Sequence, residues 1–240
     1  MLAHSNNSIA YAGTLAVDVQ VKGTSLRALL GFIANELPHW RDRVNRPAAT
    51  AEAKLTSDLA AHLNSAARFS EGWDMLQFRT EVPDEHRKER TIDLVPSPCG
   101  AIVWVNGRRY IDFDTLLPIE CKRLPTPKGK YRDEREYVFS GKSTTGGIQR
   151  FKAGYHGGAH LMGAMIGYVQ EEVAPIWFDR VSQWIEDLVR LGEAGWSRDD
   201  LIHPEPAIGK SDVSMYRSLH ARENALPDIE LLHLWVNMSP

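Results

Sequence analysis

The chain has 240 residues, of which 43% are hydrophobic and 25% are charged, and its formal net charge is −3 at pH 7. These values are ordinary for a globular protein, and the small negative charge argues against a protein that wraps nucleic acid over its whole surface. Two cysteines are too few for a disulfide framework, and neither a signal peptide nor a run of about 18 apolar residues is visible. We therefore expect a cytoplasmic protein without a membrane span.

The N-terminal part of the chain predicts a strand followed by a helix. Residues 14–22 alternate between apolar and polar or small side chains, which is typical of a strand. Thr24 or Ser25 can cap a helix that carries leucines on one face. Because Pro38 has no N–H to continue this helix, we expect it to stop at about Leu37.

The next part of the chain predicts one helix and then several strands. Leucines repeat on one face after Thr50 as far as about Arg68, which indicates a second helix. The dipeptide Asn106-Gly107 is typical of a two-residue turn between the strands of a hairpin. The strands expected in this part are 76–82, 91–95, 101–105, 110–113 and 116–124.

The remaining chain predicts alternating helices and strands. The segment 125–147 is rich in Pro, Gly, Lys and Ser and is expected to be a loop. The clearest helix is 175–191, because Pro175 suits its first turn and Gly192 suits its end. Together the elements predict one α/β domain over residues 1–240 with a mixed sheet. The other elements expected here are a short helix at 148–155 and strands at 161–169, 213–219 and 229–236.

Charged side chains in two of the predicted strands are the candidates for chemistry. Asp93 lies in TIDLV, and Glu120 and Lys122 lie in PIECKRL. Side chains two apart in a strand point to the same face, so Glu120 and Lys122 share a face. The side chain of Cys121 then points the opposite way, into the core. Charged groups among apolar residues need partners or a metal ion.

Two neighbouring carboxylates suit a hard divalent cation with oxygen ligands, which here would be Mg²⁺ or Mn²⁺. Asp93 and Glu120 would ligate this ion together with the backbone carbonyl of Cys121. The ion would polarise a phosphodiester oxygen and lower the pKa of a bound water, and Lys122 would orient that water. The alternative is an ordinary Glu–Lys pair on an exposed strand.

The order of these elements resembles the PD-(D/E)XK, or restriction-endonuclease-like, nuclease superfamily over about residues 50–170. In that family a helix with an acidic residue precedes a strand with Asp, a strand with (D/E)-x-K and a helix that often carries Gln or a basic residue. The resemblance implies an α/β fold with a mixed central sheet flanked by helices. The catalytic residues that it implies are Glu52, Asp93, Glu120, Lys122 and Gln149. The alternative for Glu52 is that it only stabilises the helix dipole, and the alternative for Gln149 is a polar position on a surface helix.

The resemblance is incomplete around the aspartate of the family. Asp93 is not preceded by Pro, and the spacing between Asp93 and Glu120 is long. Asp112 or Asp114 is therefore an alternative for the family aspartate. We prefer Asp93 because its apolar neighbours fit a central strand.

Basic residues concentrate between positions 122 and 152, where nine Lys or Arg stand against three acidic residues. Such a segment is typical of a local phosphate-binding surface, and the alternative is a solvated loop. By resemblance, the expected partner is nucleic acid, and DNA in preference to RNA. The residues expected to bind it are Arg123, Lys128, Lys130, Lys142, Arg150 and Lys152.

Other short motifs give weaker indications of a functional site. The sequence GKST at 141–144 resembles the end of a phosphate-binding loop, but Glu136 stands where that pattern requires Gly. His156 and His160 have a possible metal-ligand spacing, although the two glycines after His156 indicate a turn. The histidines expected to be hydrogen-bonded core residues are His220 and His233.

The function expected from the resemblance is that of a Mg²⁺-dependent endonuclease, in a restriction or phage-defence setting. The alternative is a catalytically inactive nucleic-acid-binding or scaffolding subunit of a larger complex, and the intact set of Asp93, Glu120 and Lys122 argues against it. No base-reading element is visible in the sequence. Specific action would therefore need a homodimer or a partner subunit.

Overall fold

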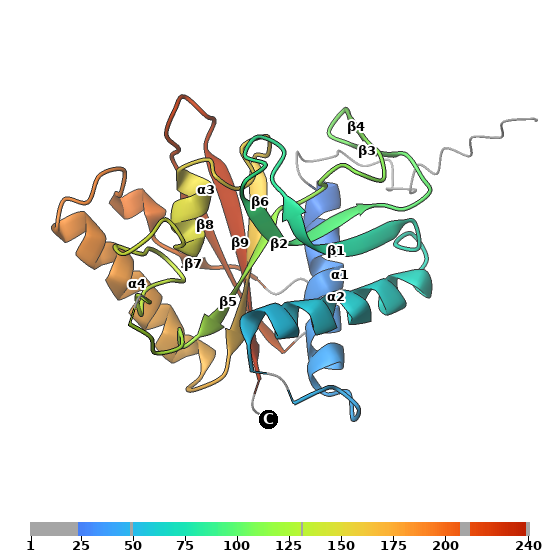
Figure 1. Cartoon of the computed structure of the whole chain (residues 1–240), viewed down its shortest axis with the longest axis horizontal. Helices are drawn as coiled ribbons and strands as arrows, with labels where there is room; N and C mark the ends of the chain where they lie inside the picture. Colours follow the sequence, from blue (N-terminus) through green and yellow to red (C-terminus); the bar gives the residue numbers. More distant parts are fainter. Residues whose placement is uncertain (1–23, 49, 131, 207–211, 239–240) are drawn as a thin grey trace, which may run out of the picture.

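Seven strands form one mixed sheet within residues 24–48, 50–130, 132–206 and 212–238, which the computed structural model describes (Figure 1). The strand predicted at 14–22 lies outside these residues. The order of strands across the sheet is β1 (Leu76–Pro83), β2 (Thr91–Pro98), β5 (Ile119–Leu124), β6 (Met162–Val169), β9 (Ile229–Asn237), β8 (Val213–His220) and β7 (His203–Pro204).

The centre of the sheet is parallel, and its two sides are antiparallel. β5, β6 and β9 run parallel to one another, whereas β1, β2, β7 and β8 pair antiparallel with their neighbours. Every residue of β6 is buried, which explains the uniformly apolar sequence at 161–169, since a parallel strand is covered on both faces. The mixed sheet expected from the sequence is confirmed.

Helices cover both faces of this sheet, α1 and α2 on one and α3 and α4 on the other (Figure 1). Alternate residues of β6 divide between the two cores. Ile166 and Tyr168 join the core that includes α1 and α2, whereas Met165 and Val169 join the core that includes α3 and α4. The helices are α1 (Thr24–Arg41), α2 (Glu52–Arg68), α3 (Gly147–Lys152) and α4 (Ala174–Arg190), with a single 3-10 turn, η1, at Arg198–Asp200.

The first helix does not stop before Pro38, and that prediction was wrong. Pro38 lies inside α1, which continues to Arg41. Proline removes one helical hydrogen bond, but the carbonyl of Pro38 still accepts one from the N–H of Asp42 at 2.9 Å. Leu37 and Trp40 on either side of it are almost completely buried. Their burial holds the last turn in a helical conformation despite the lost bond.

The predicted hairpin forms, with shorter strands than expected. β3 (Val103–Val105) and β4 (Arg108–Tyr110) pair around Asn106-Gly107, separately from the large sheet. Both turn residues have positive φ, which this type of two-residue turn requires. The strand predicted at 110–113 was wrong beyond Tyr110, because the carboxylate of Asp114 accepts a hydrogen bond from the N–H of Ile111 and closes a turn there.

The other predicted helices and strands are confirmed within a few residues of their expected ends, and residues 125–147 contain no strand or helix in their described part before α3 begins at Gly147. None of the helices in the described ranges combines the length and the apolar character that crossing a membrane requires.

Candidate active site

β2 and β5 separate from each other after one paired position. In the described part of the chain, their register consists of Leu94 opposite Ile119 alone. Beyond that point, two carboxylates take the place of a neighbouring strand. Oδ2 of Asp93 accepts a hydrogen bond from the N–H of Cys121 at 2.8 Å, and Oε2 of Glu52 accepts one from the N–H of Arg123 at 3.0 Å. Since buried backbone N–H groups need acceptors, the gap between the strands selects for acidic residues on β2 and α2.

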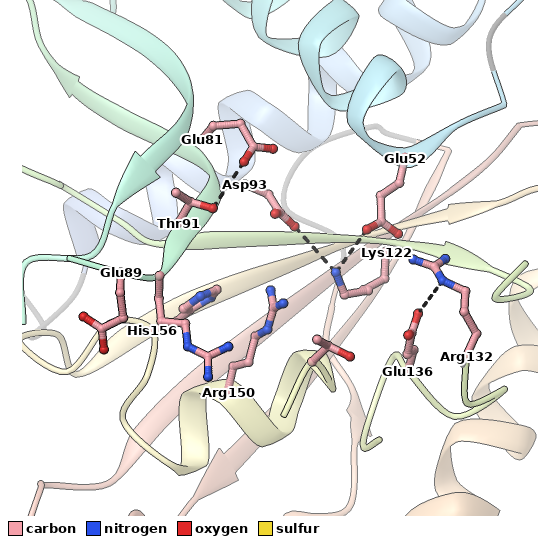
Figure 2. A pocket seen from close by; sticks show the side chains of 12 residues that line it. Glu52, Glu81, Glu89, Thr91, Asp93, Lys122, Arg132, Glu136, Arg150 and His156 are labelled. Atoms are coloured by element: carbon pink, nitrogen blue, oxygen red, sulfur yellow. Dashed lines mark hydrogen bonds and ion pairs between the residues drawn. The ribbon is translucent and has the colours of Figure 1, made fainter. Parts of the chain in front are cut away.

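The same two carboxylates meet the side chains of β5. The Nζ atom of Lys122 lies 2.8 Å from Oε1 of Glu120, 3.1 Å from Oε1 of Glu52 and 3.7 Å from Oδ2 of Asp93. Lys122 also donates a hydrogen bond to the carbonyl of Cys121 at 3.1 Å. Figure 2 shows Glu52 and Asp93 pointing toward Lys122 from different elements. Three carboxylates from β2, β5 and α2 therefore converge on one ammonium group.

Two further side chains, those of Arg150 and His156, contact the carboxylate of Glu120. Nη1 of Arg150, on α3, donates a hydrogen bond to Oε1 of Glu120. Nδ1 of His156 lies 2.9 Å from Oε2 of the same carboxylate. The side chain of Glu120 is 0% exposed, and a buried carboxylate is tolerated only where cations or hydrogen bonds compensate its charge. Lys122, Arg150 and His156 together supply that compensation.

The carboxyl groups of the cluster have opposite pKa shifts. For Glu120, burial favours the neutral form, but Lys122, His156 and Arg150 outweigh it and hold the pKa well below its usual range. For Asp93, burial and the charge of Glu120 raise the pKa to about 7. Burial alone would lower the pKa of Lys122, but Glu120, Asp93 and Glu52 raise it. At neutral pH, a charged Glu120–Lys122 pair thus stands beside an aspartate that readily gains or loses a proton.

His156 is a member of the site, although the sequence indicated it only as part of a possible metal-ligand pair with His160. As the two glycines suggested, it lies in a turn between α3 and β6 and not on a helix. Oδ2 of Asp84 accepts a hydrogen bond from the N–H of Gly157 at 2.9 Å. A Cβ atom on Gly157, whose φ is +64°, would lie 2.8 Å from Pro118. His160 does not join His156, because its ring lies near Glu85, with 3.8 Å between Nε2 and Oε1.

An open cleft of about 360 Å³ borders this cluster (Figure 2). Glu52, Asp93 and Lys122 lie along it with Arg150 and His156. The remaining residues that line the cleft come from β1, β2, the loop before β2 and the segment before α3: Glu81, Glu89, Arg90, Thr91, Arg132, Glu136 and Thr145. Its polar and charged lining suits an ionic substrate more than an apolar one.

Several predicted residues lie outside the cleft. Oε1 of Gln149 accepts hydrogen bonds from the N–H groups of Ser140 and Gly146, so this side chain stabilises the start of α3. Lys152 is buried and forms an ion pair with Asp200, so the prediction that it contacts nucleic acid was wrong. It points away from Arg150 because α3 is a helix, and its neighbours on that side belong to the core.

The alternatives for the family aspartate also lie elsewhere. Asp112 accepts a hydrogen bond from the N–H of Gly100, and Asp114 accepts one from the N–H of Ile111, so both carboxylates stabilise turns. Asp93 is the one that meets Glu120 and Lys122. The side chain of Cys121 is buried on the opposite face of the sheet, as its position in the strand predicts.

The other basic residues of the loop differ in exposure. Lys128, Lys130 and Lys142 are exposed, whereas Arg123 is half-buried. Nζ of Lys142 donates a hydrogen bond to the carbonyl of Arg132, which lines the cleft. The exposed lysines are therefore carried by the loop that borders the cleft.

The late-strand histidines form a buried hydrogen-bonded chain, as expected for core residues. Nδ1 of His220 lies 2.6 Å from Oδ1 of Asp200, and Nε2 lies 2.7 Å from Oγ of Ser218. Oγ of Ser218 also lies 2.8 Å from Nε2 of His233, which contacts the hydroxyl of Tyr137 through Nδ1. The arrangement resembles a Ser-His-Asp triad, but Ser218 is 1% exposed. No substrate reaches it in this conformation.

Comparisons with protein-family models, with curated proteins and with solved structures find no match to this chain.

The donor atoms of the cleft fit a hard divalent cation. Three carboxylates and the carbonyl of Cys121 are all oxygen ligands, which Mg²⁺ and Mn²⁺ prefer. In the arrangement described for residues 24–48, 50–130, 132–206 and 212–238, no group of His, Cys, Asp and Glu side chains is already disposed around a metal position. The ammonium group of Lys122 lies where the carboxylates converge. A cation entering the cluster would have to share its carboxylates with Lys122.

Proposed function

We propose that this protein is a metal-dependent nuclease that hydrolyses phosphodiester bonds in the cleft between β2, β5 and α3. The observation that carries the proposal is the convergence of Glu52, Asp93 and Glu120 on Lys122 at the edge of an open, charged cleft. Structural ion pairs on a strand surface rarely gather three carboxylates around one buried lysine, because the desolvation cost exceeds the gain in stability. A functional demand for that charge pattern accounts for the cost.

Asp93, Glu120 and the carbonyl of Cys121 would hold Mg²⁺ or Mn²⁺, with Glu52 close enough to assist. When bound, the ion supplies Lewis-acid polarisation of the phosphodiester and lowers the pKa of a coordinated water. Raised toward 7, the pKa of Asp93 leaves this carboxylate ready to lose its proton when a cation approaches.

The chain's own cations orient the reacting groups. Lys122 lies beside both Asp93 and Glu120, where its ammonium group orients the attacking water and offsets the negative charge that develops on the phosphate. Arg150 lines the cleft and presents a guanidinium group suited to the non-bridging oxygens of a phosphate. His156 is a positioning residue, since its contact with Oε2 holds the buried carboxylate of Glu120 in place.

The proposed substrate is nucleic acid, and DNA is favoured over RNA by the resemblance to PD-(D/E)XK nucleases alone. The exposed lysines of the 125–147 loop border the cleft and would hold backbone phosphates without reading bases. Action on a duplex would then involve a second copy of the chain or a partner subunit, so that both strands are reached.

The test is cleavage of plasmid DNA, single-stranded DNA and RNA by the purified protein, with EDTA, Mg²⁺ or Mn²⁺. We expect cleavage with either metal, none in EDTA, and a loss of roughly 10²–10³-fold or more in Glu120→Ala and Lys122→Ala. Arg109→Ala is the matched control, because this arginine lies on β4, outside the cleft. Full cleavage in EDTA, or wild-type rates in both cleft variants, contradicts the proposal.

A further inference from the structure

Arg90 lines the cleft and forms no ion pair with the acidic side chains that the structure describes. It lies at the end of the loop between β1 and β2 and lines the same cleft as Asp93. Its contacts in the described structure are with neutral groups. The guanidinium carbon lies 5.2 Å from the ring centroid of Tyr155, and Nη2 donates a hydrogen bond to Oγ1 of Thr144 at 3.0 Å.

The other cations of the cleft are paired. Lys122 and Arg150 contact Glu120, and Nε of Arg132 lies 3.5 Å from Oε2 of Glu136. Among the described residues, no carboxylate oxygen lies within 4.0 Å of a guanidinium nitrogen of Arg90. Its positive charge is therefore available to an anion that enters the cleft.

The backbone that carries Arg90 is held by Asp84, whose side chain is buried. The N–H of Asp84 donates to the carbonyl of Arg90 at 2.8 Å and closes the loop. Oδ1 of Asp84 accepts from the N–H groups of His86 and Arg87 at 2.9 Å and 3.0 Å, which shapes the first turn of the loop. Oδ2 accepts from Gly157, next to His156. One buried carboxylate thus ties the loop of Arg90 to the turn that carries a partner of Glu120.

The side chain of Arg90 is also restrained from two directions. Tyr155 follows α3, and Thr144 belongs to the loop that precedes α3, so stacking and the hydrogen bond join three segments of the chain. A guanidinium held in this way loses little conformational freedom when it binds, and its planar N–H groups match the oxygens of a phosphate. The guanidinium group is therefore preorganised for binding an anion.

We infer that Arg90, supported by Tyr155 and Thr144, binds a backbone phosphate of the nucleic-acid strand that lies next to the phosphodiester being cleaved. This inference rests on the proposed nuclease function. Arg90 is the last residue of the loop before β2 and stands three positions before Asp93, so the chain between them spans about 10 Å at most. That separation places it beside the reacting group and not on it. The ligand class is a phosphodiester backbone, read without regard to base sequence.

The experiment measures binding of fluorescein-labelled single-stranded and duplex DNA by fluorescence anisotropy in EDTA, over a range of salt concentrations. Arg90→Gln should weaken binding roughly tenfold and reduce the slope of log K against log salt by about 1. Arg87→Gln is the matched control. Its guanidinium carbon lies 5.9 Å from the centroid of the same Tyr155 ring but the residue does not line the cleft, so we expect wild-type affinity and slope.

Unchanged affinity and salt slope in Arg90→Gln overturn the inference. Equal losses of DNA affinity in Arg87→Gln and Arg90→Gln also overturn it, because they indicate a general effect of positive charge on the surface and not a binding site at Arg90. Arg90→Lys, which keeps the charge but loses the planar group, should recover the salt slope and only part of the affinity. Since binding is measured without metal, failure of wild-type cleavage in Mg²⁺ contradicts the nuclease proposal alone.

Discussion

Oδ2 of Asp93 accepts a hydrogen bond from the backbone N–H of Cys121 at 2.8 Å, at a place where β5 no longer pairs with β2. The carboxylate therefore has a structural task, to satisfy a backbone donor, as well as its position in the charged cluster. Asparagine at position 93 keeps an oxygen that can accept this hydrogen bond but cannot ionise. The two tasks can thus be separated by one substitution.

The first prediction concerns the pH dependence of stability. The pKa of Asp93 is raised from 3.8 to about 7, chiefly by burial. The folded protein then binds a proton more tightly than the unfolded chain between these values, so the contribution of Asp93 to stability falls as pH rises through that window. In EDTA, the free energy of unfolding of wild type relative to Asp93→Asn should fall between about pH 4 and pH 7. Urea titrations at several pH values measure this, and parallel curves contradict the shifted pKa.

The second prediction concerns Lys122, which separates three carboxylates. Without it, Glu52, Asp93 and Glu120 repel one another in a partly buried cluster. In EDTA, Lys122→Met should lower the free energy of unfolding by about 3–5 kcal/mol, and Mg²⁺ should restore part of this loss because the ion replaces the missing charge. Lys142→Met is the control, since that lysine is exposed. Thermal denaturation with and without Mg²⁺ measures this loss. Equal melting temperatures for the two variants contradict the stabilising role of Lys122 among the three carboxylates.

The third prediction concerns competition between Arg150 and the metal ion. Arg150 donates to the Glu120 oxygen that Lys122 also contacts, so a metal ligated by Glu120 must displace or share this cation. Arg150→Gln should therefore bind Mn²⁺ several-fold more tightly in the absence of nucleic acid, yet cleave more slowly. Isothermal titration calorimetry measures the affinity. Arg132→Gln is the control, because Arg132 lines the cleft but pairs with Glu136. An unchanged or weaker affinity in Arg150→Gln would rule the competition out.

The fourth prediction concerns the buried hydrogen-bonded chain formed by Ser218 and His220 on β8 and His233 on β9. Burial lowers the pKa of His233 to about 3, so this ring is neutral at neutral pH. Ser218→Ala removes the hydroxyl between His220 and His233 and leaves two buried ring nitrogens without it. Stability should fall by about 1–3 kcal/mol while cleavage stays at the wild-type rate. Ser65→Ala, at an exposed position of α2, should change neither. A folded Ser218→Ala protein without cleavage activity would instead assign the serine to the reaction.

The periodicity of the sequence was enough to place most helices and strands, because the spacing of apolar residues along the chain differs between a helix with one buried face and a strand. The same local rule placed Glu120 and Lys122 on one face of β5 and Cys121 on the other. It failed at Pro38, where the burial of Leu37 and Trp40 against distant residues outweighs the lost hydrogen bond. The restriction-endonuclease-like character of the fold and the nuclease activity remain predictions.

The sequence by itself determined the pair Glu120–Lys122 and singled out Asp93, since a strand with alternating faces defines their geometry. Only the tertiary structure decided that Gln149 stabilises the start of α3, that Lys152 is buried in an ion pair, and that His156 and Arg90 belong to the cleft. The orientation of those side chains depends on contacts between segments far apart in the chain, such as the hydrogen bond from Gly157 to Asp84. No periodicity encodes such a contact, because its energy depends on where the backbone of each segment has already been placed by the packing of the sheet and helices.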